Sequence, residues 1–294
     1  MAVVRFVVPY FGPWPVWFPA YLHTCRYNPN VEWLFLTDNE SPKETECPPN
    51  VKFRPLSMDG LQALAEEKIG CPVKKNAYSQ CDLRPAYGVI LSEFIKDVDF
   101  WGHCDVDVIW GRLASIFTEE TLDKFDIISS RRGQLAGHCS IYRNCEKVNR
   151  LFERIPSFRA VMAKEELCRM NESAMANAIR QAPDIAVYWK SQHVVDAREL
   201  DRRPNGWVWE SGHVMNSDAV ERAYLHFMSW KRSLRQIDFS YQDAPRKFRI
   251  TSRALWAGDV PMSSQVSEMI PSYSRMCRRT YNSLRLFLTG RGRF

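Results

Sequence analysis

The chain has 294 residues, of which 45% are hydrophobic and 25% charged, and this length suits one large domain, alone or with an appendage. Its nine cysteines form no C-x-x-C pair, which argues against a disulfide framework or a zinc site, and no run of apolar residues is long enough to span a membrane. The net charge of +6 is concentrated in residues 246–294, which hold ten basic and two acidic side chains, so nothing indicates a nucleic-acid groove along the body.

Strand-like and helix-like stretches alternate through the first half of the chain. We expect strands at 3–10, 32–39, 51–57 and 125–130, and helices at 14–27, 61–70 and 84–96. Residues 100–111 (FWGHCDVDVIWG) are an apolar run that holds two aspartates, as at the end of a buried strand. The alternation predicts a mixed α/β fold with a mostly parallel sheet flanked by helices, whose ligands collect at the carboxyl ends of the strands.

The pattern is weaker after Asn144, where we expect helices at 146–153 and 174–181 and short strands or loops at 205–214. From about Ser272, arginines alternate with apolar residues in the spacing of a basic amphipathic helix. We therefore predict one domain over 1–245 and a basic, helical C-terminal extension over 246–294. This extension either packs on the body as a solvated helix or faces an anionic membrane surface.

No secretory signal opens the sequence, so the expected location is the cytoplasm, free or at the inner face of the cytoplasmic membrane. Reduced thiols in a cytosolic protein fit the odd number of cysteines.

Polar residues follow three of the predicted strands. They are Tyr10-Phe11-Gly12 after the first strand, Asp38 after the second, and Asp105 and Asp107 in the run 100–111. Because parallel strands end at the same edge of a sheet, we expect these residues to lie near one another.

Asp105 and Asp107 stand two residues apart, so in a strand their carboxylates would share one face. Two buried carboxylates are costly unless they meet cations or water, and a hard divalent ion such as Mn²⁺ or Mg²⁺ takes oxygen ligands. The alternative is a hydrogen-bonded strand end, because D-x-D is common by chance. A second copy, Asp97-Val98-Asp99, reads as a solvated turn.

Four motifs occur in an order that resembles the GT-A (Rossmann-like) glycosyltransferases, most closely a bacterial group encoded with capsule and other surface-polysaccharide genes. They are YSQCDLRPAYG (78–88), DFWGHCDVDVIWG (99–111), GHCSIYRN (137–144) and the late His226…Lys231 pair. The resemblance covers roughly residues 3 to 231 and excludes the C-terminal tail.

For the nucleotide, the resemblance implies that Tyr10, Phe11 and Gly12 contact the base and that Asp38 accepts hydrogen bonds from base or ribose. The residue-level alternatives are a tight turn and a surface turn with its own Asx hydrogen bond. Asp82 and Arg84 would lie against the nucleotide, with Arg84 near phosphate; Asp82 could instead cap a helix.

For the cation, the resemblance implies that Asp107 binds the ion directly, while Asp105 contacts ribose or reaches the ion through water. His226 would complete the metal site, and Lys231 would bind the diphosphate. A lone histidine is usually structural, so the pairing with Lys231 is what favours His226.

For the sugars, Gly137 and His138 resemble the loop that meets the donor sugar. Glu172 stands where the family commonly has an acidic residue, and it would deprotonate the acceptor hydroxyl if the reaction inverts the anomeric centre. Its residue-level alternative is a solvated glutamate at a helix start.

The predicted function is therefore a metal-dependent glycosyltransferase of the hexosyltransferase type, using a nucleotide-sugar, most simply a UDP-sugar, and a glycan or lipid-linked glycan acceptor. Two alternatives stay open from the sequence: a sugar-phosphate nucleotidyltransferase with two-metal chemistry, and a non-catalytic protein that binds membranes through its tail.

Overall fold

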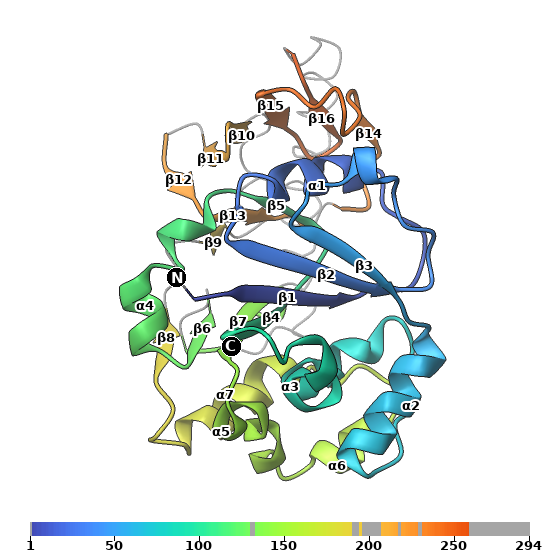
Figure 1. Cartoon of the computed structure of the whole chain (residues 1–294), viewed down its shortest axis with the longest axis vertical. Coiled ribbons are helices and arrows are strands. Elements are labelled where there is room, and N and C mark those ends of the chain that lie inside the picture. The colour runs from blue at the N-terminus through green and yellow to red at the C-terminus, as the bar shows by residue number, and fades with distance from the viewer. Residues whose placement is uncertain are drawn as a thin grey trace, which may run out of the picture.

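A seven-stranded sheet forms the centre of the computed structural model, which describes residues 2–129, 133–189, 194–195, 207–216, 219–228 and 231–258 (Figure 1). Its strands are β1 (Val4–Pro9), β2 (Val31–Thr37), β3 (Val51–Pro55), β4 (Phe100–Cys104), β6 (Ile127–Ser129), β7 (Cys139–Arg143) and β8 (Val187–Trp189). They lie in the order β3-β2-β1-β4-β7-β6-β8. β7 pairs antiparallel with β4 and β6, whereas β1–β2, β2–β3, β1–β4 and β6–β8 are parallel. The predicted mixed, mostly parallel sheet is confirmed.

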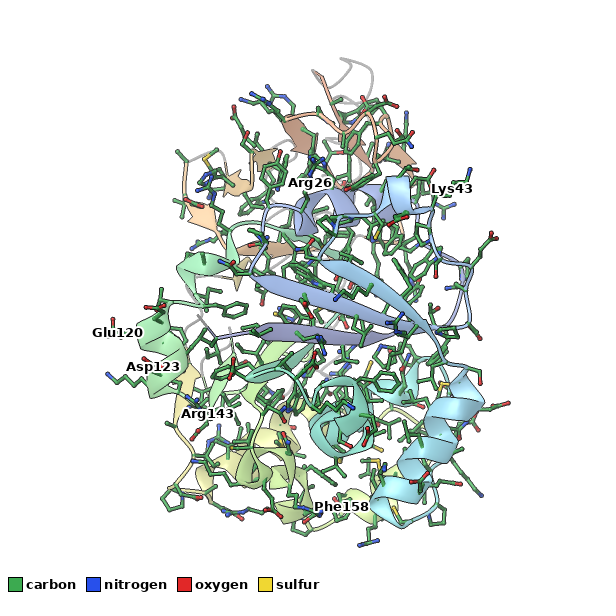
Figure 2. The ribbon with its side chains drawn as sticks, viewed as in Figure 1. Arg26, Lys43, Glu120, Asp123, Arg143 and Phe158 are labelled. Atoms are coloured by element: carbon green, nitrogen blue, oxygen red, sulfur yellow. The ribbon has the colours of Figure 1, made fainter. Side chains whose placement is uncertain are left out.

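Helices cover both faces of this sheet (Figure 1). They are α1 (Phe18–Cys25), α2 (Met58–Ile69), α3 (Tyr87–Ile90), α4 (Glu119–Lys124), α5 (Glu146–Asn149), α6 (Phe158–Met162) and α7 (Met175–Arg180). Alternation along β1 divides the core, because Phe6 and Val8 pack with α1 while Val7 packs with α2, α3 and α7. On α4, Leu122 is buried and the exposed Glu120 and Asp123 point outward (Figure 2).

Short turns connect these elements. The 3₁₀ turns are η1 (Glu44–Glu46), η2 (Ser79–Ala86), η3 (Ser92–Phe94), η4 (Leu113–Ser115) and η5 (Leu151–Arg154), and η6 (Met170–Ala174) is a π-helical turn. The single helix expected at 84–96 is wrong, because η2, α3 and η3 occupy that stretch. Pro85, inside η2, has no amide hydrogen to donate to a regular helix.

The buried strand expected in the run 100–111 is β4, which ends directly before Asp105. The rest of the apolar run forms a separate strand, β5 (Val108–Trp110). β5 leaves the central sheet and pairs antiparallel with β13 (Tyr224–His226), which pairs parallel with β9 (Val194–Val195). Asp105 and Asp107 therefore lie in the turn between two strands of different sheets.

A six-stranded sheet packs on the other side of α1 (Figure 1). Its order is β12-β11-β10-β15-β16-β14, with β10 (Trp207–Glu210), β11 (His213–Asn216), β12 (Glu221–Arg222), β14 (Gln236–Ile237), β15 (Lys247–Ile250) and β16 (Ala254–Trp256). Trp17 and Ala20 of the α1 region share a core with Trp209 and Phe248 of this sheet. The short strands expected at 205–214 are confirmed as a hairpin of β10 and β11.

The first residues of the predicted C-terminal extension are strands, since β15 and β16 lie beyond residue 245 and β15 pairs with β10. The amphipathic helix expected from about Ser272 lies outside the described residues. Among the described helices, none has the length and hydropathy that a membrane crossing requires.

Candidate active site

The turn between β4 and β5 carries Asp105 and Asp107 at the carboxyl edge of the central sheet. The amide of Asp105 donates to the carbonyl of His138 at 2.9 Å, and the indole of Trp17 donates to the carbonyl of Val106 at 2.8 Å. The predicted reason for their convergence, the two-residue period of a strand, is therefore wrong. The turn is shaped instead by hydrogen bonds to His138, which directly precedes β7, and to Trp17, which directly precedes α1.

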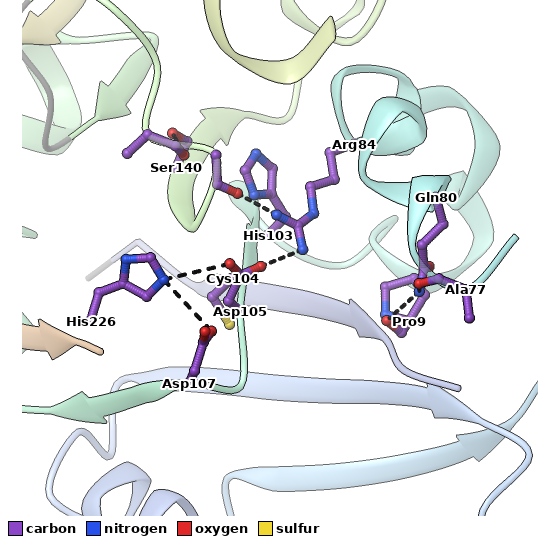
Figure 3. A network of polar contacts seen from close by, with 12 residues as sticks. Pro9, Ala77, Gln80, Arg84, His103, Cys104, Asp105, Asp107, Ser140 and His226 are labelled. Atoms are coloured by element: carbon purple, nitrogen blue, oxygen red, sulfur yellow. Dashed lines mark hydrogen bonds and ion pairs between the residues drawn. The ribbon is translucent and has the colours of Figure 1, made fainter. Parts of the chain in front are cut away.

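His226 reaches the two aspartates because β13 pairs with β5. His226 is the register partner of Val108, and the next amide, that of Phe227, donates to the carbonyl of Asp107 at 3.0 Å. His226 Nε2 lies 3.7 Å from Asp105 Oδ2 and 3.6 Å from Asp107 Oδ1 (Figure 3). Both distances are too long for good hydrogen bonds, and this buried nitrogen has no hydrogen-bond partner.

These three residues fit a divalent cation. Their ligand atoms, two carboxylate oxygens and one imidazole nitrogen, all lie within 4.8 Å of one another. Such a mixed oxygen and nitrogen set suits Mn²⁺ and also accepts Mg²⁺. The buried, unpartnered Nε2 of His226 is costly as it stands, and a bound cation would satisfy it.

Two cationic side chains flank the aspartates. Lys231 Nζ lies 2.9 Å from Asp107 Oδ2. An Arg84 nitrogen lies 2.5 Å from Asp105 Oδ1 (Figure 3). Burial alone would raise the pKa of Asp107, but the nearby His226 and Lys231 outweigh it and hold that pKa well below its usual range. Burial would likewise lower the pKa of Lys231, and the carboxylates of Asp107 and Asp105 raise it instead. Asp107 therefore stays ionised.

The predicted sugar residues lie on the far side of Arg84. Arg84 donates to the carbonyl of Gly137, which has no room for a side chain: a Cβ atom there would lie 2.8 Å from Glu172 Oε1 and 3.0 Å from Asn171 Nδ2. Asn171 is buried and Glu172 half-buried in η6. The structure thus brings Arg84, Gly137 and Glu172 together beside Asp105.

His138, the second residue of the predicted sugar loop, contacts the candidate metal ligand His226. Its ring stacks on that of His226, with centroids 4.0 Å apart and an interplanar angle of 14°, and its Nε2 lies 3.1 Å from the hydroxyl of Tyr224. Tyr224 was not predicted from the sequence. The signal was available, because Tyr224 and His226 are two residues apart on one strand and so share a face.

The loop after β1 is fixed by contacts of Tyr10 and Gly12 with nearby residues. Tyr10 donates to the carbonyl of Pro13 at 2.9 Å and stacks on Trp14, with centroids 5.0 Å apart. Gly12 adopts φ +129°, a region that favours glycine, and its carbonyl accepts a hydrogen bond from Asn39 at 2.5 Å. Burial raises the pKa of Tyr10, and the positive charge of Lys231 opposes this rise.

Two other predicted nucleotide contacts lie around this loop. Phe11 is half-buried and packs against the core cluster that contains Val7, so its ring is partly used in packing. Asp38 is exposed at the end of β2.

Asp82 has a different environment from the predicted one. Its side chain is 0% exposed and lies 3.1 Å from the ammonium of Lys75, which is also 0% exposed. Its two oxygens accept hydrogen bonds from the amides of Cys168 and Met170, each at 2.7 Å. The predicted nucleotide contact of Asp82 is therefore not supported, because its oxygens are already engaged inside the protein. Lys75 was not predicted from the sequence either.

Comparisons with known proteins add the following. The sequence matches a family described as of unknown function, DUF6625, over residues 6–257. No curated protein gives a significant match. The galactosyltransferase LgtC, solved with donor and acceptor sugar analogues, aligns over 65% of this chain and 74% of its own, at 13% identity and a TM-score of 0.37. Mouse xyloside xylosyltransferase 1 aligns over 64% and 79%, at 10% identity and a TM-score of 0.35. Both similarities are distant and indicate no function for this chain.

Proposed function

The chain belongs to the DUF6625 family, whose function is unknown, and we propose that it is a metal-dependent glycosyltransferase, which moves a sugar from a nucleotide-sugar to a glycan acceptor. One observation carries this proposal. Asp105, Asp107 and His226 converge at the carboxyl edge of a mostly parallel sheet, with Lys231 and Arg84 beside them. Ligands of such sheets collect at this edge.

Some of the site residues would bind the cation and others the diphosphate. Asp107, Asp105 and His226 would hold Mn²⁺ or Mg²⁺, which when bound offsets the negative charge that grows on a departing diphosphate. Lys231, which already contacts Asp107, is in position to add positive charge to the same phosphate oxygens. Arg84 supports Asp105 from the other side.

Glu172 is the proposed base. The acceptor hydroxyl gives its proton to the Glu172 carboxylate as its oxygen bonds to the anomeric carbon of the donor. The bond between that carbon and the diphosphate oxygen breaks, and the nucleoside diphosphate leaves with the bonding electrons. This placement is supported by the lack of room for a Cβ atom between Gly137 and Glu172 and by the hydrogen bond from Arg84 to the carbonyl of Gly137.

The finer identity of the substrates follows the resemblance in sequence. We propose a UDP-sugar as donor, with Tyr10, Phe11, Gly12 and Asp38 around the nucleoside and His138 beside the sugar. The proposed acceptor is a glycan, lipid-linked at the inner face of the membrane, in surface-polysaccharide biosynthesis.

Titration of UDP in the presence and absence of Mn²⁺ tests the proposal. We expect manganese to strengthen UDP binding at least about tenfold in the wild type, which is about 1.4 kcal/mol. Asp107→Ala should abolish the manganese effect. Asp97→Ala is the matched control, because Asp97 belongs to the second D-x-D and pairs with Arg5 at 2.6 Å on the surface. A wild type whose UDP affinity ignores manganese would overturn the proposal.

The two alternatives from the sequence are separated by simple assays. Two-metal nucleotidyl transfer would use the same two aspartates, so the products have to separate it from sugar transfer. That reaction would release pyrophosphate from a nucleoside triphosphate and a sugar phosphate. A non-catalytic membrane protein would bind liposomes and no nucleotide.

A further inference from the structure

A buried ion pair links the segment before Glu172 to the rest of the site. Lys75 and Asp82 are each 0% exposed and lie 3.1 Å apart. Pairs of this kind add little stability, because the cost of removing both charges from water offsets their attraction, whereas removing one partner is strongly destabilising. A buried pair that adds little stability suggests a further task.

That task is visible in the other contacts of the pair. Asp82 accepts hydrogen bonds from the amides of Cys168 and Met170, each at 2.7 Å, and Lys75 donates to the carbonyl of Glu166 at 3.1 Å. Between these anchors, Arg169 has φ +55°, a conformation that a non-glycine residue adopts only when its surroundings impose it. The pair therefore fixes the path of residues 166–170.

Glu172 depends on this path because η6 begins at Met170. A π-helical turn is rare and is frequently found at functional sites. This one brings Glu172 so close to Gly137 that a Cβ atom there would lie 2.8 Å from Glu172 Oε1. Two residues beyond Asp82, on the same turn η2, Arg84 contacts both Asp105 and the carbonyl of Gly137. The turn η2 thus contacts both the candidate metal ligand Asp105, through Arg84, and the segment before Glu172, through Asp82.

We propose that Lys75 and Asp82 are positioning residues, which hold Glu172 at a fixed place relative to the metal ligands. This inference rests on the proposed function, since it assigns the pair to the base of that reaction. It differs from a purely structural role because the pair acts through Glu172.

A double-mutant cycle tests the inference. The probe is slow hydrolysis of UDP-hexoses with Mn²⁺, in which Glu172 activates water in place of the acceptor. We expect Glu172→Gln to lower hydrolysis by about a hundredfold and Lys75→Met by at least about tenfold. The double variant should be no slower than Glu172→Gln alone, because residues that act as a unit are not additive.

Matched controls separate positioning from damage to the fold. Lys147→Met removes another lysine that pairs with an aspartate, Asp126 at 2.9 Å, outside the site, and it should keep wild-type hydrolysis. Manganese-dependent UDP affinity should stay within about threefold in Lys75→Met. Asp82→Asn, which keeps the shape of the side chain, replaces Lys75→Met if that variant does not fold.

Hydrogen–deuterium exchange provides a readout that needs no turnover. In Lys75→Met, amides of residues 168–174 should exchange at least about tenfold faster, while those of β4 stay protected. Additive losses in the cycle, or unchanged protection of 168–174, would overturn the inference. A failure of the proposed function shows instead in the wild type, as UDP affinity that ignores manganese.

Discussion

Gly137 is the residue at which a single added methyl group tests the arrangement most directly. Gly137→Ala would press a Cβ atom to within 2.8 Å of Glu172 Oε1, so Glu172 has to move. We expect a loss of about tenfold or more in activity with manganese-dependent UDP binding retained. Gly258→Ala is the control, because a Cβ atom at that position meets nothing within 4 Å. Equal activity of the two variants would contradict the placement of Glu172.

A substitution of Lys231 tests the proposed diphosphate contact. If its ammonium binds the diphosphate, Lys231→Met should weaken UDP binding about tenfold and reduce the dependence of that binding on salt. Lys247→Met serves as the control. Lys247 also pairs with a carboxylate at 2.9 Å and is similarly exposed, but it lies on β15 of the other sheet. Calorimetric titration of both variants at two salt concentrations decides between them.

The sequence predicted the aspartates, His226, Lys231, Gly137 and Glu172, and these lie around one site. It did so because their chemistry is marked by residue type and by resemblance. It did not predict the environment of Asp82, since nothing local to that aspartate shows that Lys75 and two distant amides occupy its oxygens. Burial of a charge is decided by chain segments far away in sequence.

Among elements, the strand pair β5–β13 had the least local signal. β4 and β5 read as one apolar run, and the point at which the chain leaves the central sheet depends on β13, which follows far along the chain. The period of apolar residues does not reveal such a partner. The helix and strand order of the first half was predictable because each element there carries its own periodicity and end signals.

Trp209 of β10 tests how the second sheet is attached. Its ring is 0% exposed and stacks on Phe248, with centroids 4.9 Å apart, and its indole donates to the carbonyl of Trp110 at 2.9 Å. Trp209→Ala should cost about 3–5 kcal/mol in the free energy of unfolding, and Trp209→Phe less, because a ring remains. Tyr78→Ala, at a ring that is 74% exposed, should stay within about 0.5 kcal/mol in the same urea titration.

For the whole molecule, buried histidines predict a loss of stability in acid. Burial, assisted by the charge of Arg26, lowers the pKa of His23 to about 4. In the unfolded chain, the His23 side chain takes up a proton near its ordinary pKa of about 6.5. As the pH falls from 6.5 towards 4, the unfolded state therefore gains protons that folded His23 does not, and about 3 kcal/mol is lost.

Urea unfolding at pH 7 and at pH 4.5 checks this expectation. His23→Phe should show a smaller difference between the two pH values than the wild type. An unchanged difference would mean that His23 does not contribute.

Removal of the basic C-terminal tail tests whether the tail binds anionic membranes. A chain that ends at residue 258 keeps β15 and β16, whereas one that ends at 245 would remove two paired strands. We expect the 258-residue chain to keep its UDP affinity and to lose binding to anionic liposomes, if the basic tail faces a membrane. Sedimentation with vesicles of anionic lipid measures this, and unchanged sedimentation would contradict a membrane role for the tail.

The three candidate ligands come from two distant parts of the sequence, and this affects when the cation site forms during folding. Two of them follow β4, in the first half, and the third closes β13, near the end of the described fold. A nascent polypeptide, or one cut between these strands, holds only part of the cation's coordination sphere. The proposed sugar transfer would therefore begin only after the late strands have docked.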